Sequence, residues 1–379
     1  MSEKLILDES MDKVQLIENT KESLFLKQSK NIKAKKVPKN LEYINFIKII
    51  SSYGIVILHT NPFWGDNFKN KKRWIFTNLL EQFFHYTVPF FVLCVGATLL
   101  DFNEKYGLRI YYKRRFLKIV IPLVGWSILT YYYRIYFVKN LQKRRFSIAY
   151  ILDLFFYNKI YGLFYSFHIF IVIYMIIPLL AYVKKEDKIY IYSYGFFIIL
   201  INKGIIPYLI DIFNIRFIWP YKIKATGYIL YIFSGYIIEN HKFSRISKKI
   251  IYIIGFSFIL VQIIGTYILT YKYQGINLTH TGFLKLPTIL YSNAFFLFIK
   301  DNYYIFSRIF NKNLINKLGT LTIGPFFLHM PLMDFFKKFP ILILNIDLFT
   351  LYGGTLLCIM CFGLTFILQK IPIINYLIP

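Results

Sequence analysis

Beyond a polar first segment, the chain consists of long apolar runs separated by short polar and mostly basic stretches. Most runs hold about 17–25 residues, which lets a helix rising 1.5 Å per residue cross about 30 Å of hydrocarbon. The pattern predicts an all-α integral membrane protein, a bundle of about ten transmembrane helices. The predicted spans are 42–61, 77–100, 116–138, 163–183, 189–210, 225–238, 250–271, 283–299, 318–336 and 348–368.

The same pattern divides the chain into three parts. Residues 1–40 are polar and contain no short apolar stretch followed by small residues, so we expect a disordered cytosolic tail and no cleavable signal peptide. Residues 41–370 form the predicted membrane domain, and residues 371–379 a short C-terminal tail.

Composition narrows the class of protein. Hydrophobic residues make up 56% and charged residues 17%, yet the formal net charge is +27. Apolar spans with basic flanks reconcile these numbers, which exclude a soluble enzyme, a disordered chain and a disulfide scaffold. With the N-terminus inside, the inner loops and tails carry 27 Lys and Arg and the outer loops 15. We therefore expect both termini in the cytosol, a multi-pass protein of the cell (inner or plasma) membrane, and membrane lipid rather than nucleic acid as partner.

Two polar residues in the first span need an explanation. Lys48 and His59 are eleven residues apart, so they project from one helix face about 16 Å apart along the axis. A histidine can act as a general base near neutral pH. Alternatively, Lys48 extends to the inner headgroups and His59 sits in the outer interface.

This span resembles the opening motif of acyltransferase family 3, membrane proteins that acylate sugars at bacterial surfaces. The family motif is Asp-x-x-Arg/Lys, ten residues, then His. Asn45, Lys48 and His59 fall on its three positions, with Asn45 where Asp is common.

Further stretches resemble the family's later motifs, in the same order. His85 and Val95 replace the usual Arg and Ser of the second motif, and Tyr165 replaces a Trp. The stretches are His85–Gly96, Arg114–Ser127, Tyr165–Pro178, Ser234–Tyr236 and Gly324–Pro331.

The resemblance implies an acetyl-CoA-dependent O-acyltransferase that acts on a sugar hydroxyl of a cell-surface polysaccharide or lipid-linked glycan. His59 would take the proton from the hydroxyl or carry the acyl group briefly. Arg114, Arg115 and Lys118, with Lys48, would bind the phosphates of coenzyme A, although ordinary topology also explains basic residues there. Supporting positions are Asn45, Glu81, His85, Tyr165 and His329, with Glu81 one turn before His85.

Other readings remain open. A polysaccharide exporter or flippase, or a non-catalytic subunit of a glycan-synthesis complex, would share the apolar pattern. Cys358 and Cys361 have the spacing of a metal or redox pair, but they lie in an apolar run without a second pair. No metal is predicted, and the oligomeric state is not predicted.

Overall fold

The computed structural model describes residues 42–61, 70–138, 165–213, 227–336, 349–372 and 374–378. Residues Tyr43–Pro379 belong to one compact unit. The predicted tail at 1–40 lies outside the described residues. All secondary structure in the described residues is helical, which confirms the all-α prediction there.

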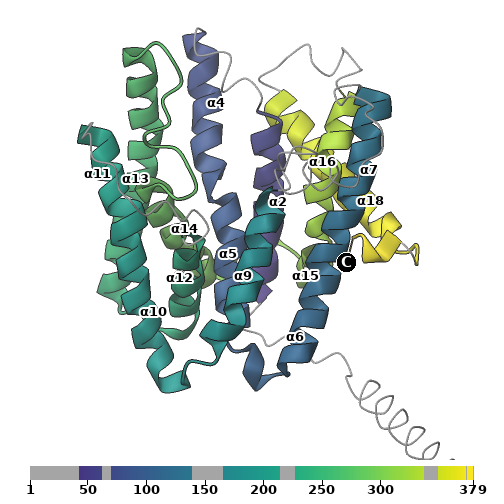
Figure 1. Cartoon of the computed structure of the whole chain (residues 1–379). Helices are drawn as coiled ribbons and strands as arrows, with labels where there is room; N and C mark the ends of the chain where they lie inside the picture. The colour runs from purple at the N-terminus through teal and green to yellow at the C-terminus, as the bar shows by residue number, and fades with distance from the viewer. Residues whose placement is uncertain are drawn as a thin grey trace, which may run out of the picture. The chain divides into compact units, whose positions relative to one another are not determined.

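Each predicted span is helical over most of its described residues, and several spans comprise two or more consecutive helical segments (Figure 1). Short 3-10 and π segments join several helices end to end: η2 (Phe84–Tyr86), η4 (Phe116–Val120), η5 (Arg134–Val138), η7 (Leu200–Ile205) and η10 (Phe349–Gly353). The α-helices are α2 (Glu42–His59), α4 (Lys71–Phe83), α5 (Thr87–Leu99), α6 (Leu108–Arg115), α7 (Ile121–Tyr133), α9 (Tyr165–Ala181), α10 (Lys185–Ile199), α11 (Ile206–Phe213), α12 (Ile229–Asn240), α13 (Arg245–Lys272), α14 (Leu286–Ile309), α15 (Lys312–Leu321), α16 (Ile323–Phe336) and α18 (Gly354–Leu368).

Among the described residues, 5 helical stretches are long and apolar enough to cross a membrane. They are Lys71–Glu104, Leu108–Tyr136, Lys185–Phe213, Arg245–Lys272 and Thr350–Leu368. The other predicted spans are shorter or more polar, as in α14, which contains Lys300, Asp301 and Arg308. The count of about ten spans and the cytosolic placement of both termini therefore stay predictions.

Helices α5 and α12 pack closely through two glycines. A Cβ atom on Gly96 would lie 2.1 Å from the carbonyl oxygen of Ile232, and one on Gly235 would lie 2.2 Å from that of Leu93. Each glycine thus meets the backbone of the opposite helix, an approach that small residues permit in membrane helices. Both glycines belong to stretches that resemble family motifs, and the structure gives them a packing role.

Helix α2 contacts segments from distant parts of the chain. The Ser52 hydroxyl donates to the carbonyl of Thr322, 2.9 Å away, and Tyr53 Oη lies 3.0 Å from Thr355 Oγ1. At the start of α2, the Tyr43 hydroxyl donates to Glu239, which forms an ion pair with Lys300 at 3.0 Å. The start of α2 and the end of α12 therefore lie at the same end of the unit. This end, which contains Tyr43, Glu239 and Lys300, is called here the basic end.

Candidate active site

A cavity of about 720 Å³ lies between helices at the basic end. Its cationic lining comes from Lys48 of α2 and from Arg115 and Lys118, at the junction of α6 and η4. Polar groups from α2, α5, α9 and α15 complete the wall, including Asn45, Thr98, Ser166 and Thr320. Three of the four cations predicted to bind a phosphate-bearing donor thus surround one space.

The local backbone accounts for the position of Lys118. Pro122, near the start of α7, has no N–H to donate to the Lys118 carbonyl, and its ring crowds that carbonyl. The chain forms a π-helical segment over Phe116–Val120, which ends two residues before this proline. Arg115 and Lys118 both border the cavity across this junction, as their spacing predicts.

Aromatic rings hold the Arg115 side chain. Its guanidinium carbon lies 5.3 Å from the centroid of the Tyr174 ring and 5.7 Å from that of Tyr111. The Tyr111 hydroxyl donates to the Tyr174 carbonyl at 3.0 Å, which ties α6 to α9. The Nε atom of Arg115 is buried without a hydrogen-bond partner in the described chain. The guanidinium is therefore positioned by stacking and keeps a donor for a ligand.

Arg114 is not brought to this cavity. It is exposed, and its guanidinium carbon lies 4.5 Å from the centroid of the Tyr106 ring. One residue along a helix turns the side chain by about 100°, so Arg114 and Arg115 face different surroundings.

Asn45 forms part of the wall beside α15. The Asn45 amide donates to Asn316 Oδ1 at 3.0 Å. A Cβ atom on Gly319 would lie 2.6 Å from the Cβ atom of Asn45. Asn45 thus positions α2 against α15.

His59 and His329 form a pair beyond the cavity. Their ring centroids lie 5.1 Å apart with the planes inclined at 31°. Neither histidine lines the cavity, but Phe326 does, and His329 follows it by three residues, about 4.5 Å along α16. The two rings therefore sit about one helical turn past the inner cavity wall formed by α16.

The tautomer of His329 follows from one hydrogen bond. Its Nδ1 lies 2.6 Å from the carbonyl oxygen of Pro325, which can only accept, so Nδ1 carries the proton. In the neutral ring Nε2 is then a lone-pair acceptor, and it is buried without a partner among the described residues. His59 makes no hydrogen bond within the described chain, and its side chain is half-buried.

Aromatic stacking fixes the helix that carries His329. The Phe327 ring lies between Trp126 at 5.3 Å and Phe167 at 4.7 Å, with interplanar angles of 9° and 17°. Helix α16 is thereby held between α7 and α9, and the position of His329 is set by packing rather than by a loop.

A second buried histidine lies beside α4. His85 Nδ1 is 3.8 Å from Glu81 Oε1, and the ring stacks on Phe283 at 4.7 Å. Asn61, two residues after His59, donates to Glu81 Oε2 at 3.3 Å. Glu81 and His85 are therefore neighbours without a hydrogen bond between their side chains, since His85 Nδ1 is buried without a partner among the described residues, and Asn61 links Glu81 to the end of α2.

Several contributors could not be predicted. Gln369, Asn375 and Ile378, from the segment after α18, also line the cavity. Trp126 Nε1 donates to the Leu377 carbonyl at 3.0 Å, which holds this segment in place. Tyr165 is the first described residue of α9. No group of three or more metal-binding side chains gathers in the described parts of the chain.

The sequence was compared with models of known protein families. The sequence model described as an acyltransferase domain (Acyl_transf_3) matches residues 41–370. The chain belongs to this family, acyltransferase family 3, as the motifs predicted: it is an acyltransferase and a membrane protein. Neither a curated protein nor a solved structure matches it.

Proposed function

We propose that this protein is an acetyl-CoA-dependent O-acyltransferase of the cell membrane that acylates a sugar hydroxyl of a cell-surface polysaccharide or lipid-linked glycan. One observation carries the proposal: a cation-lined cavity at the basic end lies about one helical turn from the His59–His329 pair. The cavity has the chemistry to hold an anionic carrier, and the pair has the chemistry to move a proton.

The donor occupies the cavity with its phosphates toward the basic end. Arg115 binds a phosphate through its guanidinium fork, and Lys48 and Lys118 add point charges. Coenzyme A is a cytosolic molecule with several phosphates, so this assignment places the basic end in the cytosol, as the distribution of Lys and Arg predicts. The extended arm carrying the thioester then follows the face shared by Lys48 and His59.

The transfer takes place at the histidine pair. His59 removes the proton from the sugar hydroxyl as its oxygen attacks the thioester carbonyl carbon. The carbon–sulfur bond breaks, and the leaving thiolate takes up the proton from the imidazolium. His329 positions this step, because its Nε2 can accept a hydrogen bond from a ring N–H of His59 and so orient the imidazole that takes the proton. The surrounding helices exclude water, which limits hydrolysis of the thioester.

The acceptor approaches from the opposite end of α2. Asn61, Glu81 and His85 offer hydrogen-bonding groups there, next to the end of α2 that carries His59. These residues are assigned to the sugar or to the support of His59, as is Tyr165.

Mass spectrometry of surface polysaccharide tests the function as a whole. Glycans from cells with the gene are expected to carry acetyl groups that are absent from cells without it or with His59→Ala. The matched control is His241→Ala, since His241 is exposed after α12 and does not line the cation-lined cavity. Identical glycan masses in all four strains would refute the proposed acceptor class.

A further inference from the structure

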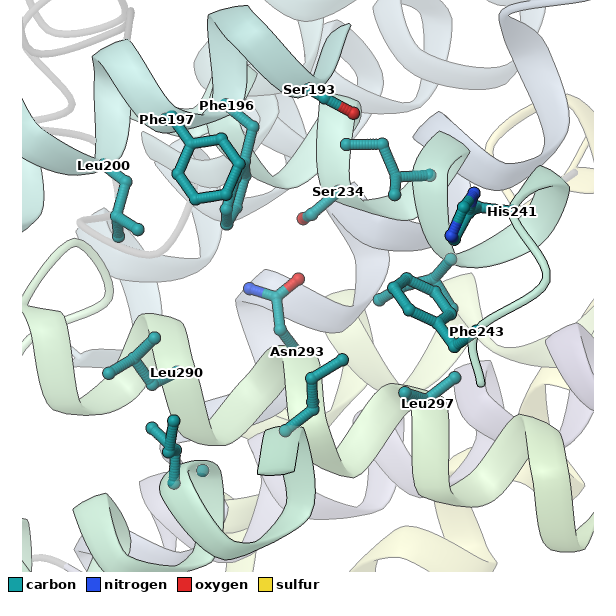
Figure 2. A pocket seen from close by; sticks show the side chains of 15 residues that line it. Ser193, Phe196, Phe197, Leu200, Ser234, His241, Phe243, Leu290, Asn293 and Leu297 are labelled. Carbon is teal, nitrogen blue, oxygen red and sulfur yellow. The ribbon is translucent and has the colours of Figure 1, made fainter. Parts of the chain in front are cut away.

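A second cavity, of about 390 Å³, lies between α10, α12, α13 and α14, and shares no lining residue with the candidate active site. Figure 2 shows Leu, Phe and Ser side chains around it. Helix α10 packs on α12 through Tyr192 and Phe233, whose rings stack at 5.1 Å. Helix α13 packs on α14, where a Cβ atom on Gly255 would lie 2.1 Å from that of Ala294.

This cavity meets the surface of the unit between α10 and α13. Phe197 of α10 and Ile254 of α13 line it and are 58% and 43% exposed. Both helices belong to stretches long and apolar enough to span a membrane. Such an opening admits a molecule dissolved in the bilayer rather than one in water.

One polar atom in the cavity lacks a partner. The Asn293 amide nitrogen donates to the Ile289 carbonyl at 2.8 Å, which leaves Oδ1 as an acceptor. That oxygen is buried and makes no hydrogen bond in the described chain. In Figure 2 it points to the side of the cavity where Ser234 lies. A buried acceptor without a donor is costly in an apolar environment, so a ligand that donates a hydrogen bond gains affinity there.

We propose that this cavity binds an uncharged, single-chain alcohol from the bilayer. Its hydroxyl donates to Asn293 Oδ1 and lies near the hydroxyls of Ser193 and Ser234, while its hydrocarbon chain fills the apolar part. The volume is near the lower end of the range for small-molecule sites, which favours one chain over two. The inference does not depend on acyl transfer, because it concerns binding alone.

Photolabelling of the purified full chain in phosphatidylcholine vesicles tests this site. The probe is a long-chain primary alcohol with a diazirine and a terminal alkyne, and the comparator is its methyl ether, which cannot donate a hydrogen bond. The alcohol is expected to label peptides of α12 and α14 about fivefold more strongly than the ether, the value of one hydrogen bond. An excess of unlabelled monoacylglycerol should displace the probe, and diacylglycerol should displace it less.

Two matched variants test whether Asn293 is the residue that accepts the hydrogen bond from the alcohol. Asn293→Leu should lower labelling by the alcohol to the level of the ether. Asn302→Leu should change nothing, since Asn302 makes the same contact on the same helix, with Phe298 at 2.8 Å, and does not line the cavity. Equal labelling of the wild-type chain by alcohol and ether would overturn the proposal without any variant. Labelling confined to other helices would overturn it as well.

Discussion

The imidazole rings of His59 and His329 lie 5.1 Å apart, although 270 residues separate them in the chain. His329 has its tautomer set by the Pro325 carbonyl and presents Nε2 as an acceptor. Because the proton of His329 is held by the Pro325 carbonyl, we assign the proton taken from the sugar hydroxyl to His59 and a positioning role to His329.

Two substitutions at His329 separate the roles of its ring nitrogens. Asn reaches the position of Nδ1 and keeps the bond to Pro325, but it provides nothing at Nε2. Gln reaches the position of Nε2 and can accept there. We expect His329→Gln to retain more acyl transfer than His329→Asn, with both proteins folded, as measured by initial rates of thiol release. Equal rates for the two variants would show that Nε2 has no role.

The cation-lined cavity predicts a specific effect on donor binding. Arg115→Gln should raise KM for acetyl-CoA about tenfold to a hundredfold, because a hydrogen bond to a charged group contributes about 1.5–3 kcal/mol. Lys113→Gln is the control, since Lys113 is exposed on the same helix and does not line the cavity. Arg114→Gln should resemble the control. A larger effect at Arg114 than at Arg115 would contradict the placement of the donor.

Two glycines should respond to the same substitution with opposite signs. Gly363→Ala, in α18, meets no atom within 4 Å, and it should stabilise the helix by up to about 1 kcal/mol. Gly96→Ala forces α5 away from the backbone of α12 and should destabilise the protein by about 1–3 kcal/mol. Thermal unfolding in detergent measures both. Stabilisation by Gly96→Ala would contradict the close approach of these helices.

A buried histidine in the loop between α13 and α14 predicts a pH dependence of stability. Burial lowers the pKa of His280, and nearby Lys285 adds to this effect. The Tyr208 hydroxyl lies 2.6 Å from its Nδ1. Since the folded state favours the neutral ring, this contribution is full above the unfolded pKa of about 6.5 and declines as pH falls below it. Between about pH 7.5 and 5.5, the melting temperature should fall more for wild type than for His280→Gln. Parallel curves would contradict this assignment.

The helical segments could be read from the sequence because each apolar run is a local signal. Which side chains of a helix face the interior depends on contacts with other helices, so it cannot be read from the local sequence. Arg114 and Arg115 are equivalent in sequence, yet only Arg115 borders the cavity. The position of the Arg115 side chain depends on stacking against Tyr174, which lies on another helix.

Polar contacts between residues far apart in the chain could not be predicted from the sequence either. Lys188 stands among charged residues at the start of α10, yet its side chain is 2% exposed and pairs with Asp101 at 2.7 Å. The wall formed by Gln369 and Asn375 depends on how the segment after α18 returns to α7. Pairs such as His59 and His329 emerge only when the helices assemble, although each histidine could be singled out by its motif.

The most direct test measures release of free coenzyme A thiol by the purified chain in vesicles, with acetyl-CoA and a glycan acceptor. We predict acceptor-dependent release by the wild type and by His241→Ala, and loss of release in a folded His59→Ala protein. Undiminished, acceptor-dependent release by His59→Ala would contradict the central claim that His59 carries the proton of the transfer.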